Sequence, residues 1–99
     1  MADIAITRTD TATKARIVGR VDGIKEEAEL TLSKLSESVV IADHTSVPDA
    51  MRGMGVGAAL VDRLIADARA AQQRIVPLCP FVRAQAQLHK AEWSDVIQW

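Results

Sequence analysis

The sequence predicts an α+β fold: a mixed, mostly antiparallel sheet of about four to five strands with two helices. Three observations lead to this prediction. Apolar and polar residues alternate in the first half of the chain, as in strands with one wet face. From Val56 onward the apolar residues recur at helical spacing instead. Between the two lies a glycine-rich turn at residues 53–57. At 99 residues this fold is expected to form a single domain, residues 1–99.

Four strands are predicted before the glycine turn, at Ile4–Arg8, Arg16–Val21, Ala28–Leu35 and Ser38–Thr45. Thr9–Lys14 is a polar turn, and Asp22-Gly23 is typical of a tight hairpin turn. The last of these strands is more continuously apolar than the others, as expected for a buried central strand.

The second half begins with a helix whose apolar stripe consists of Val56, Leu60, Val61, Leu64, Ile65 and Ala68. Ile75–Cys79 follows as a short strand, parallel to Ser38–Thr45 if the helix is a crossover. Pro77 and Pro80 remove two backbone donors, so this strand cannot be paired throughout. Phe81–Lys90 is expected to form a second helix, with Leu88, Val82 and Gln85 as the candidates for its inward-facing residues. An apolar tail, with Trp93, Val96, Ile97 and Trp99, is expected to fold back.

Composition narrows the class of partner. The chain has 12 basic and 13 acidic side chains, a balance that argues against a nucleic-acid partner. Residues 51–99 hold six basic and four acidic groups, so the half with the glycine turn is mildly positive. A single cysteine, Cys79, excludes an internal disulfide and a cysteine zinc cluster, and no metal is expected. No signal peptide or membrane span is recognisable, so we expect a cytoplasmic protein that does not associate with a membrane.

The glycine turn predicts an anion site. Glycine lacks Cβ, so its backbone can approach a ligand closely. The helix that follows adds its unpaired first-turn N–H groups and the positive end of its dipole. Strand, turn and helix start together suit a phosphate or a diphosphate.

Two phosphate-binding patterns fit this turn poorly. A P-loop needs Lys-Ser or Lys-Thr after its last glycine, where this chain has Ala58-Ala59. The dinucleotide pattern G-x-G-x-x-A is present from Gly53 to Ala58. It should be followed about 20 residues later by an acidic residue. Gln72–Ile75 stands there instead, and too little chain follows for the rest of such a domain.

A third pattern fits well. Arg52-x-x-Gly55-x-Gly57-Ala58 resembles the acyl-CoA loop of the GCN5-related N-acetyltransferases. His44-Thr45-x-Val47-Pro48 before it and Pro77-x-Cys79-Pro80-Phe81-Val82 after it are similar to the very small single-domain branch of that superfamily. The resemblance extends from about Ala15 to the C-terminus. One departure lies near His89-Lys90, where the branch usually reads His-Pro-Glu-aromatic; the chain has an extra residue and no proline.

The resemblance implies an acetyl-CoA-dependent N-acetyltransferase in which the two strands flanking the glycine helix splay apart and admit the pantetheine arm. The residues it assigns to the cofactor are Thr45, Val47, Arg52, Gly53, Met54, Gly55, Val56, Gly57 and Ala58. The loop amides would bind the CoA diphosphate, and Arg52 would be a charge partner.

Two residues are candidates for catalysis. Cys79 ends the last strand, where the resemblance puts the thioester; it could be a nucleophile, a general acid, a residue that packs against the cofactor, or core filler. His44 is a candidate base for the attacking amine, or a residue that fixes the strand-to-loop turn. The first alternative to an enzyme is an acyl-CoA-binding or sensor module without turnover, and the second is a structural interaction domain that binds no CoA. The acceptor amine, a protein lysine or a small amine, is left open, as is the choice between monomer and homodimer.

Overall fold

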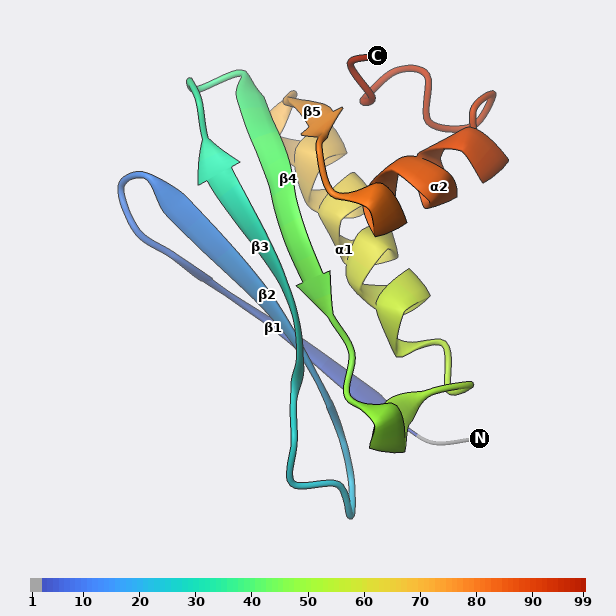
Figure 1. Cartoon of the computed structure of the whole chain (residues 1–99). Helices are drawn as coiled ribbons and strands as arrows, with labels where there is room; N and C mark the ends of the chain where they lie inside the picture. The colour runs from blue at the N-terminus through green and yellow to red at the C-terminus, as the bar shows by residue number, and fades with distance from the viewer. Residues whose placement is uncertain (1–2) are drawn as a thin grey trace.

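The structure, a computed structural model, describes residues 3–99 as one five-stranded sheet with two helices packed against it (Figure 1). The strands are β1 (Ile4–Asp10), β2 (Lys14–Val21), β3 (Ala28–Lys34), β4 (Val39–Ser46) and β5 (Arg74–Pro77). They lie in the sheet in chain order, β1 to β4 antiparallel and β5 parallel to β4. The α+β class with a mostly antiparallel sheet is therefore confirmed.

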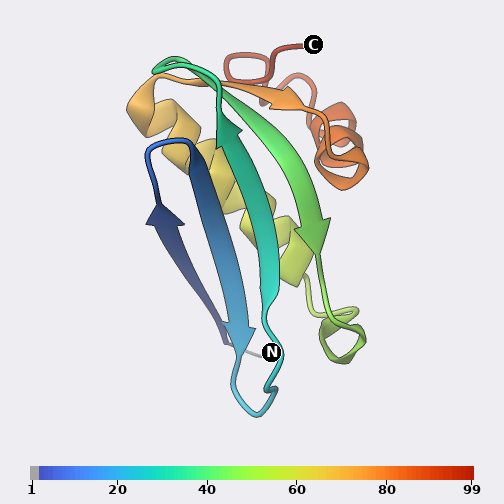
Figure 2. The ribbon, with the colours of Figure 1, turned by 60° about the vertical axis from the view of Figure 1, so that its left-hand side comes forward.

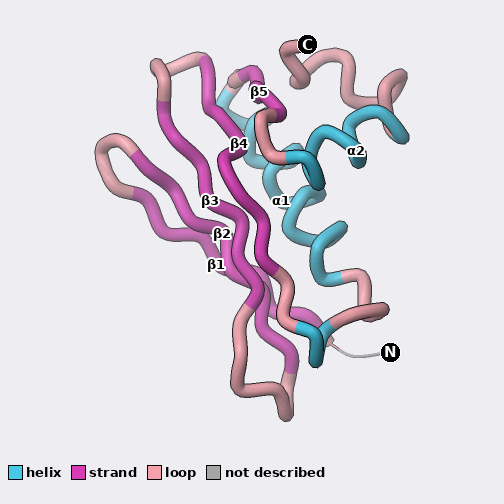
Figure 3. Tube along the Cα trace, in the orientation of Figure 1, coloured by secondary structure: helices cyan, strands magenta, loops and turns pink. Residues whose placement is uncertain are grey.

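Two helices complete the fold. The 3₁₀ turn η1 (Asp49–Met51) follows β4, and α1 (Val56–Ala71) then crosses back to β5 (Figure 3). Helix α2 (Pro80–Leu88) starts just after β5. Its N1 position is a proline, whose missing N–H costs nothing there. In the described part of the chain, neither helix is long and apolar enough to span a bilayer.

The core lies between the sheet and the helices. Helix α1 packs on β1, β2 and β3, while α2 packs on β4 and β5. The six stripe residues predicted for α1 are all buried, as are the alternate residues Ile17, Leu30 and Leu32 of the strands beneath. Burying a side chain of this size contributes about 1.5–3 kcal/mol. The apolar pattern of the sequence therefore accounts for the sheet-on-helix packing.

Two predictions about the C-terminal third need correction. Leu88 is 76% exposed, because α2 buries Val82 and Ala86, which lie one turn apart on the opposite side of the helix. Strand β5 ends at Pro77 rather than at Cys79.

The tail folds back as predicted for Trp93, Val96 and Ile97, whereas Trp99 is exposed. The amide of Ile75 donates to the carbonyl of Val96 (2.6 Å), and the amide of Gln98 donates to the carbonyl of Ile75 (2.8 Å). These bonds cover the outer edge of β5, which would otherwise present unpaired backbone groups.

Candidate functional site

The glycine turn stands open to solvent where α1 begins. Gly53 and Gly55 have left-handed backbone with φ of +79° and +76°, a conformation that glycine adopts without steric cost. A Cβ added to either residue would meet nothing within 4 Å. The space beside both glycines is therefore free for a ligand.

The first turn of α1 supplies hydrogen-bond donors to that space. No side chain caps the helix at Gly55. The first bond of the helix joins the Ala59 amide to the Gly55 carbonyl (3.0 Å). The amides of Val56, Gly57 and Ala58 consequently have no intrahelical acceptor. Together with the helix dipole they fit the oxygens of a diphosphate.

Arg52 brings a positive charge to the same place. Its Nε lies 2.8 Å from Oδ1 of Asp49, and its side chain is 77% exposed. An ion pair this exposed contributes only about 0–1 kcal/mol to stability. The guanidinium can therefore exchange the Asp49 carboxylate for a phosphate at little cost.

A β-bulge in β4 decides which side chains face the helices. The register passes from the pair Leu32–Ala42 to the pair Thr31–His44, so Asp43 is the extra residue. An inserted residue reverses the alternation of faces beyond it. Thr45, paired with buried Leu30, therefore points to the helix side, and His44 points to the other face.

Strand β4 continues beyond its partner. Pairing with β5 ends at Ala42, whose carbonyl still accepts the Cys79 amide (2.8 Å) before the chain turns into α2. A groove of about 590 Å³ lies at this open part of β4. It is lined by His44, Thr45, Ser46, Val47, Arg52 and Phe81. The backbone of an extended ligand could pair with such a free strand edge.

The structure brings most of the predicted cofactor residues together. Thr45, Val47 and Arg52 line the groove. The turn beside it exposes four of the others and buries two: Gly53, Met54, Gly55 and Ala58 are exposed, and Val56 and Gly57 are buried.

The two predicted catalytic side chains are not together. Cys79 precedes α2 as its N-cap, is 3% exposed and belongs to the apolar core. Its Sγ lies 3.3 Å from Oγ1 of Thr45, behind the wall of the groove. His44 is exposed on the opposite face of the sheet. The chain positions of these residues could not reveal this separation, because the bulge sets it.

Phe81 is a groove residue for which the sequence analysis predicted no role. A Cβ on Gly57 would lie 2.8 Å from Cζ of Phe81, 3.2 Å from its Cε2 and 3.5 Å from Cγ2 of Val47. Because Gly57 has no side chain, the ring packs directly on the first turn of α1. Gly57 therefore has two roles: its missing side chain makes room for the Phe81 ring, and its amide is one of the donors at the start of α1.

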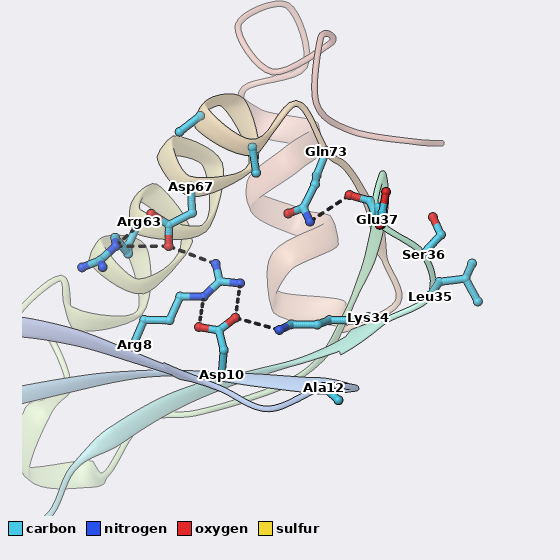
Figure 4. A pocket seen from close by; sticks show the side chains of 12 residues that line it. Arg8, Asp10, Ala12, Lys34, Leu35, Ser36, Glu37, Arg63, Asp67 and Gln73 are labelled. Atoms are coloured by element: carbon cyan, nitrogen blue, oxygen red, sulfur yellow. Dashed lines mark hydrogen bonds and ion pairs between the residues drawn. The ribbon is translucent and has the colours of Figure 1, made fainter.

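A larger cavity, about 880 Å³, lies at the other end of α1 (Figure 4). Arg8 spans it. Its Nε and Nη2 donate to the carboxylate of Asp10, and its Nη1 donates to Asp67; each donor–acceptor distance is 3.0 Å. Asp67 also accepts from Arg63 (3.0 Å), and Asp10 lies 3.1 Å from Nζ of Lys34. Each of the three cations is thus paired with one of the two carboxylates, and the cluster ties β1 to α1.

Comparison with known proteins agrees with this geometry. A family model described as GCN5-related N-acetyl-transferase matches residues 16–96, most of the chain. The matched region contains the open edge of β4, the glycine turn and both helices. No curated protein matches the chain.

Proposed function

The chain belongs to the GCN5-related N-acetyltransferase family, and we propose on this basis that it transfers an acetyl group from acetyl-CoA to an amine. The observation that supports the proposal best is the continuity of the anion site with the groove. The open glycine turn, the free amides of α1 and Arg52 lie at one end, and the unpaired edge of β4 leads away from them.

In this proposal the amides of Val56, Gly57 and Ala58, with Arg52, hold the CoA diphosphate. The backbone of Thr45 and Val47 pairs with the pantetheine arm along the edge of β4. When bound, acetyl-CoA supplies an acetyl group activated as a thioester. Phe81 closes the helix side of the groove and excludes water from the arm.

His44 is the proposed base. Its side chain is exposed and lines the groove, and histidine is the side chain that most often serves as a general base. A general base of this kind contributes about 10²–10⁴-fold to the rate.

Cys79 is proposed as a positioning residue. A nucleophile has to reach the acetyl carbon. The Cys79 thiol lies behind Thr45 and the residue is 3% exposed, so a ligand in the groove has little access to it. We therefore favour direct attack by the amine over an acetyl-Cys79 relay. The Cys79 thiol fixes Thr45 through their 3.3 Å contact.

A CoA-binding module without turnover is the second candidate. It is favoured by one observation: Cys79 and His44 do not converge on a common point.

The two candidates separate when the protein is incubated with acetyl-CoA and a panel of primary amines, followed by mass spectrometry and thiol detection. The proposal predicts an acetylated amine with free CoA, no acetyl adduct on the protein, and a rate about 10²-fold lower for His44→Ala. CoA binding without product would favour the module. An adduct on the wild type that Cys79→Ala lacks would establish the covalent relay instead.

A further inference from the structure

The extra residue of the β4 bulge, Asp43, is held by two side chains from neighbouring strands. Oδ2 of Asp43 accepts a hydrogen bond from Oγ of Ser33 (2.6 Å), and this Oγ accepts one from Nζ of Lys14 (2.6 Å). Nζ of Lys14 also lies 3.8 Å from Oδ2 of Asp43. Ser33 follows buried Leu32, so these three residues, the bulge cluster, lie on the face of the sheet that points away from α1. In Figure 2 the strands that carry the bulge cluster lie in front of α1.

The apolar pattern leaves the register of β4 open at the bulge and beyond it. Before the bulge, Val40 and Ala42 are buried and fix which face of the strand meets the core. Residues 43–46 read Asp-His-Thr-Ser and are polar on both faces. Register is weakly specified in a strand of this kind. The pairing of residues 43–46 with β3 therefore depends on individual polar contacts.

A regular ladder is the alternative to the bulge, and it would reverse this part of β4. Leu30 would then pair with His44, whereas it pairs with Thr45 in the structure. The side chain of His44 would point toward the helices. Thr45 would point away from them, leave the wall of the groove and lose its 3.3 Å contact with Sγ of Cys79. The register thus decides whether Thr45 lines the groove.

We propose that the bulge cluster positions Thr45 by holding β4 in the bulged register. In this register Asp43 stands between the levels of Leu32 and Thr31. A regular ladder would place it level with Thr31, farther along the sheet from Ser33. The hydrogen bond from Ser33 to the carboxylate therefore favours the bulge, and the charge on its acceptor makes it one of the stronger kinds. The register is a property of the fold, whereas its effect on CoA binding rests on the proposed function.

Nuclear Overhauser contacts between the backbones of β3 and β4 test the register without a ligand. The wild type should show Leu30 opposite Thr45. In Asp43→Ala we expect this contact to weaken and a contact between Leu30 and His44 to replace it. Asp43→Asn keeps an oxygen that accepts from the Ser33 hydroxyl, so it should keep the wild-type contacts.

Two further variants make this test specific. Ser33→Ala removes the hydroxyl between the carboxylate and the ammonium group and should shift the contacts in the same direction as Asp43→Ala. Glu27→Ala is the matched control. It also removes an ion-paired carboxylate, the partner of Arg16 and Arg20, but one outside the pairing of β3 with β4, so it should keep the wild-type contacts. Wild-type contacts in both Asp43→Ala and Ser33→Ala would overturn the proposal, even where these variants unfold at a lower temperature.

Calorimetric titration of CoA into the same proteins tests the positioning of Thr45. We expect CoA binding about tenfold weaker in Asp43→Ala, as for a protein whose binding-competent register is populated to about one tenth. Asp43→Asn and Glu27→Ala should bind CoA within about twofold of the wild type. A changed register with unchanged CoA affinity would overturn the positioning role. A wild type that binds no CoA would lose the proposed function, and the contacts of Leu30 would still decide whether the bulge cluster holds the register.

Discussion

At the residue scale, Phe81 both packs on Gly57 and lines the groove. The ring occupies the position that any larger side chain at residue 57 would need. Phe81 is 38% exposed, so the ring can move, and the direction open to it is toward the groove it lines.

Gly57→Ala should therefore lower CoA affinity more than stability. Alanine gains about 0.5–1 kcal/mol in helix propensity, which offsets the displacement of the ring. We expect a free energy of unfolding within about 1 kcal/mol of the wild type and CoA binding at least about tenfold weaker by calorimetry. The double variant Gly57→Ala/Phe81→Leu should recover affinity. Unchanged affinity in the single variant would show that the ring does not control the groove.

Single residues of the site differed in how far they could be predicted. The open turn at Gly53 and Gly55 could be predicted from the sequence, because few residues other than glycine adopt a positive φ. The role of Phe81 could not, because its place in the groove wall depends on packing against elements distant in sequence.

At the scale of elements, periodicity predicted the strands and α1, but not the bulge at Asp43. A bulge depends on how two strands pair, and neither strand carries a local mark of it. The prediction that Leu88 of α2 faces the core was wrong for a related reason. The apolar residues of this nine-residue helix lie on two sides, Phe81 and Leu88 on one and Val82 and Ala86 on the other, so packing decides which side is buried.

The tail is the element whose contribution to stability is most easily measured. Ile97 is fully buried and bridges to Ile75, where it covers the edge of β5. Ile97→Ala should destabilise by about 2–5 kcal/mol in urea unfolding, the range for a buried isoleucine cut to alanine. Trp99→Ala, at an exposed position of the same tail, should cost much less. Equal losses would mean that the tail does not pack as described.

At the scale of the whole molecule, the two ends of α1 have different roles. The N-terminal end opens to the candidate site, and the C-terminal end is tied to β1 through Arg8 and Asp67. This ionic cluster joins residues 59 positions apart, so no local pattern predicts it.

The cluster predicts how stability depends on pH. Hydrogen bonds from Arg8 first, and then from Lys34, lower the pKa of Asp10. A carboxyl with a lowered folded pKa stabilises the fold above its unfolded value of about 3.9, and this contribution is lost as pH falls through the folded value. Asp10→Asn should therefore lower Tm near pH 7 and flatten its fall below about pH 4. Asp22→Asn, in the exposed β2–β3 turn, should keep the wild-type acid slope. Parallel curves for wild type and Asp10→Asn would contradict the assignment.

The account as a whole depends on main-chain amides at the start of α1 binding the diphosphate of CoA. Calorimetric titration of CoA into the wild type, Gly55→Glu and Gly23→Glu tests it most directly. Gly23 is a matched control: its φ is +84°, a Cβ there also meets nothing within 4 Å, and it lies in the β2–β3 turn. Both substitutions thus put a non-glycine residue in left-handed backbone, but only the one at residue 55 puts a carboxylate in the proposed diphosphate site. We predict saturable binding to the wild type and Gly23→Glu, and binding at least about a hundredfold weaker to Gly55→Glu, a difference of about 2.7 kcal/mol. Equal affinity for all three proteins, or no binding to the wild type, would contradict the account.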